Sequence, residues 1–174
     1  AGLTYGKDVY DKERYKRIRQ LSAIMMADLS NKPLEQVEGL FCNEVGYQTP
    51  KIDTRAAIFK EDKILLVQEK NGTWSLPGGW CDVNVSVMEN TIKEVKEEAG
   101  LDVVVKNVIA IQDREKHNQP IYAYKVCKIF MLCEVEGGII KEKSETIGFD
   151  YFTKDNLSLL ATEKNNEEQI QMCF

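Results

Sequence analysis

The stretch LPGGWCDVNVSVMENTIKEVKEEAGL, residues 76–101, joins a Pro-Gly-Gly turn to an acidic segment. Glycines directly after a strand let the backbone pass close to a ligand. From Ser86 to Ala99 the apolar residues recur at three- and four-residue steps, which predicts a helix. Ser86 can cap this helix, with Glu89 three residues further on completing a capping box. The stretch therefore predicts a turn and a helix that together frame a binding site.

Three carboxylates crowd the last part of that helix. Glu94, Glu97 and Glu98 fall within an arc of about 100°, so we expect them to converge on one small volume. Like charges this close repel one another, which costs stability unless a cation sits among them. Hard divalent ions prefer carboxylate oxygens, so Mg²⁺ is the expected occupant, with Mn²⁺ as an alternative. Taken alone, an ExxEE motif with interspersed lysines favours a solvated helix face, and the neighbouring turn changes this interpretation.

Composition restricts the class of protein. The chain has 174 residues, is 43% hydrophobic and carries a net charge of −5, which favours small-molecule chemistry over a broad nucleic-acid surface. The five cysteines form no CxxC pair, so we expect reduced thiols rather than a disulfide framework or a zinc site. No apolar run approaches the roughly 20 residues that span a bilayer. We expect a cytoplasmic protein without a membrane partner; its start without Met leaves room for upstream residues.

Apolar periodicity divides the chain into a helical extension and a mixed domain. Residues 10–29 and 33–41 predict two helices, and 42–50 read as a linker. We therefore expect an N-terminal helical extension over residues 1–48 and a second domain over 51–174. Strands are expected at residues 52–59, 64–68, 103–112, 123–135 and 149–152, with a last helix within 163–174. This order predicts an α/β fold, a mixed α/β sandwich rather than a doubly wound parallel sheet.

The turn and the acidic helix together resemble the signature of the Nudix hydrolases. That signature reads Gly, five residues, Glu, seven residues, then Arg-Glu-apolar-x-Glu-Glu-x-Gly-apolar. The positions that match in register are Gly79, Glu94, Val95, Glu97, Glu98, Gly100 and Leu101. Two positions depart, because Val85 stands where the signature has its first Glu and Lys93 where it has Arg. Lys93 keeps a positive charge for the neighbouring carboxylates but loses the two-pronged geometry of Arg.

The resemblance extends over nearly the whole chain. The stretches GLTYGKDVYDKERY (2–15), DTRAAIF (53–59) and LPGGWCDV (76–83) resemble a Nudix subgroup with an N-terminal helical extension, in which a non-acidic residue replaces the first Glu. The subgroup's DRxKH stretch and ET pair are matched by Asp113, Arg114, Lys116 and His117, and by Glu145 and Thr146. Members have been assigned to hydrolysis of ADP-ribose or of CDP-choline. The resemblance thus implies a Nudix-type α/β/α sandwich.

The resemblance also implies a reaction and a set of roles. We expect a Mg²⁺-dependent pyrophosphohydrolase that cleaves a nucleoside diphosphate linked to X into a nucleoside monophosphate and phosphorylated X. The expected metal ligands are Glu94, Glu97 and Glu98, and the expected catalytic residues are Glu97, Glu98 and Glu145. Lys93 and Gly100 are expected to orient the helix, and Arg55, Gly79, Arg114, Lys116 and His117 to contact substrate. Glu98 or Glu145 would accept the proton of the attacking water.

Several of these residues have a second interpretation. Glu145 is equally compatible with an exposed turn. Arg55 lies in an apolar strand, so it needs an anionic partner, which could be a substrate phosphate or a structural carboxylate. His117, beside Arg114 and Lys116, is either a phosphate or ribose contact or a solvated loop residue.

Four aromatic residues lie close to these motifs. Tyr122 and Tyr124 alternate at the start of an expected strand, which predicts rings on opposite faces of the sheet. Trp74 and Trp80 flank the glycine turn, and we expect both in the core rather than as platforms for a nucleobase.

The N-terminal extension leaves two questions open. Its basic run KERYKRIRQ, residues 12–20, is either a solvated helix face diluted by nearby acids or a track for an RNA backbone. Its apolar stripes exceed what two short helices can bury, which predicts a homodimer contact or a lid over the base pocket. The alternatives to the hydrolase are a non-catalytic nucleotide sensor and an RNA exonuclease or decapping-type enzyme.

Overall fold

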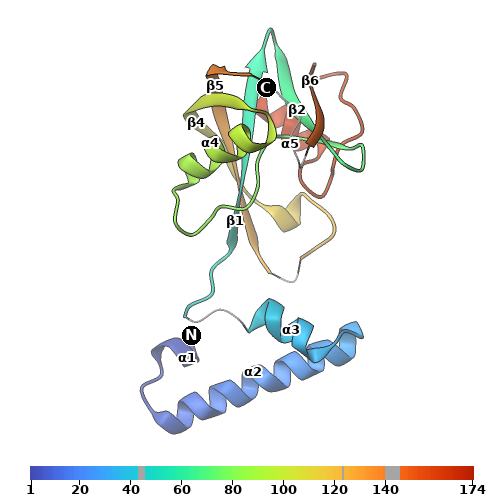
Figure 1. Ribbon diagram of the computed structural model, residues 1–174. Helices are drawn as coiled ribbons and strands as arrows, with labels where there is room; N and C mark the ends of the chain where they lie inside the picture. Colours follow the sequence, from blue (N-terminus) through green and yellow to red (C-terminus); the bar gives the residue numbers. More distant parts are fainter. Residues whose placement is uncertain (43–45, 123, 140–145) are drawn as a thin grey trace. The chain divides into compact units, whose positions relative to one another are not determined.

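The computed structural model describes residues 1–42, 46–122, 124–139 and 146–174 (Figure 1). The chain forms two compact units, Ala1–Thr49 and Pro50–Phe174. Within the described residues, no helix is both long enough and apolar enough to cross a membrane.

Helices make up the N-terminal unit. They are α1 (Gly2–Tyr5), α2 (Val9–Ser30) and α3 (Leu34–Phe41). The two predicted helices agree with α2 and α3 to within a residue at each end, whereas α1 was not predicted. Asp8 caps α2 by accepting a hydrogen bond from the Asp11 N–H at 3.0 Å, which satisfies one of the free donors of the first turn.

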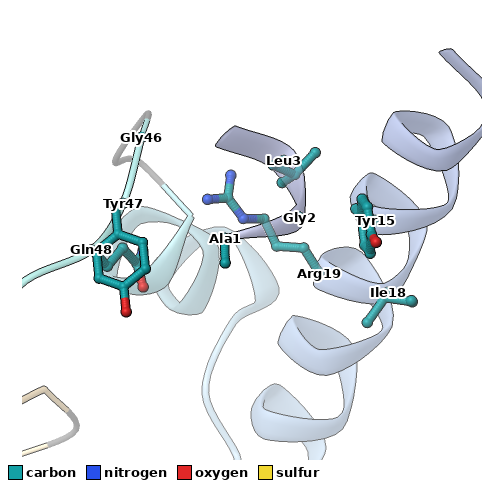
Figure 2. Close-up of a pocket in the computed structure, with 9 residues that line it drawn as sticks. All are labelled: Ala1, Gly2, Leu3, Tyr15, Ile18, Arg19, Gly46, Tyr47 and Gln48. Atoms are coloured by element: carbon teal, nitrogen blue, oxygen red, sulfur yellow. The ribbon is translucent and has the colours of Figure 1, made fainter. Parts of the chain in front are cut away.

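This unit buries little of its apolar surface. Its described core consists of Ala23, Ala27 and Val37. The large apolar side chains exposed on α2 are Val9, Tyr10, Tyr15, Ile18, Leu21, Met25, Met26 and Leu29. An open cavity of about 370 Å³ lies within the unit (Figure 2). Its lining residues are Ala1, Gly2, Leu3, Tyr15, Ile18, Arg19, Gly46, Tyr47 and Gln48, none of which belongs to the predicted site.

A mixed sheet forms the centre of the second unit. Its described strands are β1 (Lys51–Lys60), β2 (Lys63–Glu69), β3 (Trp74–Ser75), β4 (Leu101–Asp113), β5 (Val126–Gly138) and β6 (Thr146–Phe152). The order is β3-β2-β1-β5-β4, and β6 pairs with β2. Strands β1 and β5 run parallel, while the other ladders are antiparallel. The predicted mixed α/β sandwich is confirmed. Strand β3 was not predicted. Strand β5 begins at Val126, whereas the predicted strand began at residue 123, and residue 123 lies outside the described residues.

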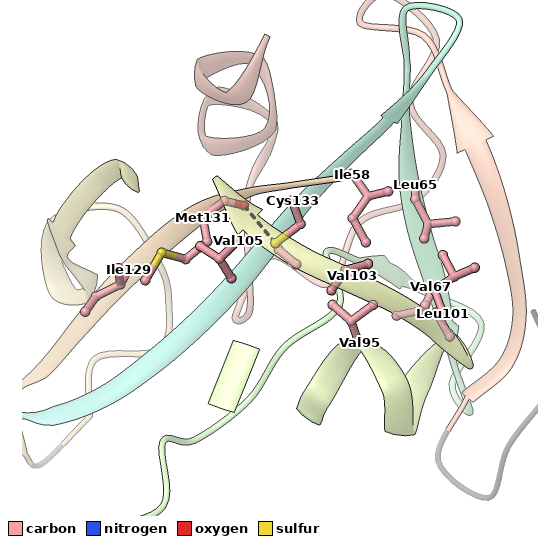
Figure 3. Packing of buried hydrophobic residues seen from close by; sticks show 12 residues of the cluster. Ile58, Leu65, Val67, Val95, Leu101, Val103, Val105, Ile129, Met131 and Cys133 are labelled. Atoms are coloured by element: carbon pink, nitrogen blue, oxygen red, sulfur yellow. Dashed lines mark hydrogen bonds between the residues drawn. The ribbon is translucent and has the colours of Figure 1, made fainter. Parts of the chain in front are cut away.

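Helices cover both faces of this sheet. On one face α4 (Val87–Glu98) packs its fully buried Val95 into a cluster with Ala56 and Ile58 of β1 (Figure 3). On the other face α5 (Glu167–Cys173) packs Ile170 against Ala57. Successive residues of β1 therefore alternate between two cores, as the pleat of a strand buried on both sides requires.

Local signals fix both ends of α4. Ser86 and Glu89 form the predicted capping box, with Ser86 Oγ accepting from the Glu89 N–H at 3.2 Å and Glu89 Oε2 from the Ser86 N–H at 2.8 Å. Gly100 follows the helix with φ +75°, a left-handed conformation that ends it. Helix α5 is shorter than the predicted segment because Asn166 caps it.

Candidate active site

The glycine turn is held tightly against β1. The Thr54 N–H donates to the Gly79 carbonyl at 2.9 Å, and the Ala56 N–H donates to the Pro77 carbonyl at 2.8 Å. Gly78 has φ +145°, and a β-carbon placed on it would lie 1.9 Å from the Thr54 carbonyl oxygen. Any side chain at position 78 would therefore push the turn off the strand.

Glu98 meets this turn from the end of α4. Its side chain is almost fully buried, and Oε2 accepts a hydrogen bond from the Gly78 N–H at 2.8 Å. Burial raises the pKa of Glu98 to about 7, although the Gly78 N–H and the nearby Arg55 act in the opposite direction. Thr146 Oγ1 donates to the Glu98 backbone carbonyl at 2.8 Å, which ties β6 to the end of the helix.

Glu94 approaches the same turn one helical turn earlier. A β-carbon on Gly79 would lie 2.7 Å from Glu94 Oε2, so the missing side chain of Gly79 leaves room for this carboxylate. The Glu94 side chain is 14% exposed, whereas that of Glu97 is 58% exposed. Glu94 and Glu98 therefore gather at the turn, while Glu97 faces solvent.

The expected convergence of three glutamates is not found. Within the described residues, no group of three or more His, Cys, Asp or Glu side chains is placed to hold a metal ion. The separation has a physical cause, because Glu98 turns to the Gly78 N–H and Glu97 lies 3.9 Å from Lys93 Nζ. Two carboxylates with hard oxygen donors at one glycine turn still fit a divalent cation such as Mg²⁺, which completes its shell with water and substrate phosphates.

Lys93 links the helix to the segment that follows the turn. Its Nζ donates to Asp82 Oδ2 at 2.8 Å and lies 3.7 Å from Glu94 Oε1. This hydrogen bond raises the pKa of Lys93. Sequence reasoning missed Asp82, which stands three residues before Val85. The signal was available, since an acid close to the non-acidic Val85 position is the nearest replacement for the missing Glu.

Arg55 has a carboxylate partner within the protein. Its Nη2 donates to Asp53 Oδ1 at 2.7 Å, its Nε donates to Asp53 Oδ2 at 3.2 Å, and its Nη1 donates to the Leu76 carbonyl at 3.2 Å. Lys128 Nζ donates to the same Asp53 carboxylate at 2.6 Å. All three side chains are buried. Of the two partners considered for Arg55, a substrate phosphate or a structural carboxylate, the structure contains the structural carboxylate. Arg55 therefore fixes the strand that precedes the turn.

The shifts in pKa within this buried cluster follow from its charges. Burial alone would raise the pKa of Asp53, but Arg55 and Lys128 outweigh it and lower that pKa. Burial lowers the pKa of Lys128 to about 8, and repulsion by Arg55 adds to this effect.

Arg114 is a second buried arginine. It is 2% exposed, its Nη1 donates to the Pro120 carbonyl at 2.7 Å, and its Nη2 donates to the Glu163 carbonyl at 3.0 Å. These contacts tie its loop to the segment at Glu163 and speak against the predicted contact with phosphate or ribose. Lys116 and His117 lie on the exposed side of the loop, and their substrate roles stay predictions. Glu145 lies outside the described residues.

Two predictions for the aromatic residues were wrong. Tyr122 and Tyr124 precede β5, and their ring centroids lie 5.6 Å apart, so they do not face opposite sides of a sheet. Trp80 is 48% exposed and therefore is not a core residue. Trp74 does pack beside the second core, with its ring 4.9 Å from that of Phe152.

The second unit is an α/β/α sandwich, because its mixed sheet lies between two helices. Two carboxylates at the glycine turn give it an acidic site. The chain belongs to the Nudix hydrolase family, since residues 49–173 match the model of the NUDIX domain. Residues 1–41 match a second model, described as a UDP-X-like, N-terminal oligomerisation domain.

Two of the three relatives described here extend over both matched regions. YjhB of Bacillus subtilis (strain 168), provisionally named an ADP-ribose pyrophosphatase, is 44% identical over the whole of this chain and 84% of its own length. The crystal structure of an ADP-ribose pyrophosphatase from Streptococcus suis 89-1591 shows 55% identity and a TM-score of 0.67, covering 72% of this chain and 90% of that one. A UDP-X diphosphatase structure shows 32% identity and a TM-score of 0.70, covering 99% and 84%. These similarities favour an enzyme over the non-catalytic sensor.

Proposed function

We propose that the protein hydrolyses the diphosphate bond of a nucleoside diphosphate linked to X, with Mg²⁺ or Mn²⁺ bound at the Gly78–Gly79 turn. The observation that carries the proposal is the meeting of Glu98 and Glu94 at this turn, one through the Gly78 N–H and the other at the space left by Gly79. The resemblance to ADP-ribose pyrophosphatases and to a UDP-X diphosphatase supports a substrate of this class.

Glu94 and Glu98 would be the principal ligands of the metal, and Glu97 a third ligand or an orienting partner. When bound, the ion neutralises the diphosphate and makes a water molecule a stronger nucleophile. Lys93 holds Glu94 from the solvent side, and Gly100 ends the helix just after Glu98. Because Gly79 has no side chain, its backbone at the turn would lie close to the substrate.

A carboxylate must accept the proton of the attacking water. Glu98 suits this task, since its carboxylate lies at the turn where the diphosphate would bind. Glu145 is the alternative general base. It precedes Thr146 in the sequence, and the Thr146 hydroxyl donates a hydrogen bond to the Glu98 backbone carbonyl. The products would be a nucleoside monophosphate and a phosphorylated X.

A substrate panel tests this proposal. The protein is incubated with ADP-ribose, CDP-choline and a UDP-sugar, each with Mg²⁺, with Mn²⁺ and with EDTA, and the products are identified by chromatography. Release of the nucleoside monophosphate from at least one conjugate, abolished by EDTA, is expected. Failure to cleave any member of the panel with either ion would refute the proposal.

We also propose that the protein is a homodimer formed through its N-terminal unit. Helix α2 leaves eight large apolar side chains exposed, Leu21 and Met25 among them, and exposed apolar surface of this kind is typical of a contact between subunits. The oligomerisation model that matches residues 1–41 supports the same conclusion. Light scattering coupled to gel filtration should give twice the chain mass, and a monomer at micromolar concentration would contradict this.

A further inference from the structure

A small cavity opens directly beside the glycine turn. It has a volume of about 220 Å³ and is lined by Lys51, Ile52, Trp80, Cys81 and Tyr124. Trp80 and Cys81 follow Gly79 in the chain, so the cavity begins where the proposed diphosphate site ends. We refer to these five residues as the aromatic cavity.

One wall of the aromatic cavity is held by backbone contacts to β1. Trp80 forms an isolated antiparallel bridge with Asp53, and the Cys81 N–H donates to the Ile52 carbonyl at 2.9 Å. Asp53 is itself fixed in the buried cluster with Arg55. The position of the Trp80 backbone is therefore determined by the strand that also carries the turn.

The other wall includes the Tyr124 ring, which belongs to a row of aromatic rings. The Tyr124 ring lies 6.2 Å from the Trp80 ring and 5.6 Å from the Tyr122 ring, centroid to centroid. The buried guanidinium of Arg114 sits 3.5 Å above the Tyr122 ring centre. Since Arg114 is anchored by backbone carbonyls, it holds the row of rings in place.

The exposure of Trp80 is unusual for so large an apolar side chain. Nearly half of its surface is open to water, although the adjacent sheet offers two apolar cores. An indole fixed at a cavity mouth beside a tyrosine ring is a stacking platform for a flat aromatic ligand. Such platforms bind nucleobases by their faces, which every base possesses.

We propose that the aromatic cavity binds the nucleobase of the substrate, stacked on Trp80 with the tilted Tyr124 ring at its edge, while the diphosphate occupies the adjacent turn. This inference rests on the proposed function for its substrate class. It assigns base recognition to the residues that follow the glycine turn and to Tyr124, and it gives Arg114 a positioning role through Tyr122.

Binding is tested through Trp80 fluorescence. The chain has two tryptophans, so Trp74→Phe leaves Trp80 as the sole indole, and phenylalanine preserves the packing of position 74 against Phe152. AMP should quench this emission with saturation, whereas ribose 5-phosphate, which lacks the base, should not at the same concentrations. Equal responses to the two probes would overturn the proposal.

Kinetics provide the second test. Trp80→Leu and Tyr124→Leu should each raise the KM for ADP-ribose by about tenfold or more, with a much smaller change in kcat, because the base is bound but does not react. Phe149→Leu, at a similarly accessible ring on β6, is the matched control and should leave KM unchanged. Unchanged KM in both cavity variants would also overturn the proposal.

The two tests separate this inference from the proposed function. Saturable quenching by AMP without hydrolysis of any conjugate would retain the nucleobase site and remove the reaction. Hydrolysis without quenching, and with normal KM in Trp80→Leu and Tyr124→Leu, would retain the reaction and remove the site.

Discussion

Two ionic groups flank the glycine turn, and they differ in burial. Behind the turn, Asp53, Arg55 and Lys128 form the buried cluster, in which each side chain is about 6% exposed or less. In front of it, Asp82 and Lys93 form the exposed pair, in which the side chains are 56% and 39% exposed.

This difference in burial determines at which positions a charged side chain can be replaced with little loss of stability. A buried charge must be paired, since leaving it alone costs several kcal/mol, and so the buried cluster holds its strand and the Leu76 carbonyl in one arrangement. An exposed pair is screened by water and contributes little to stability. An exposed pair can therefore use lysine at position 93, where the family signature has arginine, with little effect on stability.

The largest expected effect is at the centre of the buried cluster. Asp53→Asn keeps the shape of the side chain but leaves two buried cations without their carboxylate, so we expect a loss of about 3–5 kcal/mol in the free energy of unfolding. Urea denaturation measures this loss. Asp155→Asn, at an exposed position, is the control and should behave as the unchanged protein. A loss below about 1 kcal/mol would show that the cluster does not hold the turn.

The turn itself offers a matched pair of substitutions. Gly78→Ala places a β-carbon against the Thr54 carbonyl at positive φ, so we expect destabilisation by at least about 1–3 kcal/mol. Gly79→Ala meets only the end of the Glu94 side chain, which can move. It should leave the denaturation midpoint nearly unchanged and lower hydrolytic activity. Equal loss of stability in the two variants would contradict this division of roles.

The buried cluster also predicts a dependence on pH. Because the pKa of Lys128 is about 8 in the folded protein and near 10.5 when exposed, the unfolded chain binds more protons between these values. Raising the pH from 8 to 10.5 should therefore stabilise the folded protein through this residue. Lys128→Met should remove that contribution. The measurement is the difference between the two proteins in free energy of unfolding across this range, and a constant difference would be the contrary result.

The exposed pair should give the smallest change in stability. Asp82→Asn removes the charge of the carboxylate that Lys93 contacts at 2.8 Å, so we expect an unchanged denaturation midpoint but a several-fold lower kcat, because Lys93 and with it Glu94 are less firmly positioned. Val85→Glu in the same chain returns an acid to the position that the family signature gives it and should restore kcat. Full activity of Asp82→Asn, or no rescue by Val85→Glu, would show that the pair does not act on Glu94.

Sequence patterns predicted the features that depend on neighbours along the chain. The capping box at Ser86 follows from residues three apart, and the placement of Glu94 and Glu98 follows from helical periodicity. The pairing of Asp53 with Arg55 was also within reach, since residues two apart on a strand share a face.

Features set by contacts between distant segments were not predictable in this way. The separation of Glu97 from Glu98 depends on the Gly78 N–H, 20 residues away from Glu98. The burial of Arg114 depends on the Glu163 carbonyl, and the exposure of Trp80 on where the turn meets β1. Periodicity carries no information about such partners.

The central claim is that the carboxylate of Glu98 at the Gly78 N–H is required for hydrolysis. In Glu98→Gln an amide oxygen can still accept that hydrogen bond, so the fold is kept while the charge and the basic group are lost. We predict a decrease in kcat for ADP-ribose or the best conjugate of about 10²-fold or more, with an unchanged denaturation midpoint. Glu136→Gln, at an exposed position of β5, should keep full activity. A Glu98→Gln protein as active as this control would contradict the account.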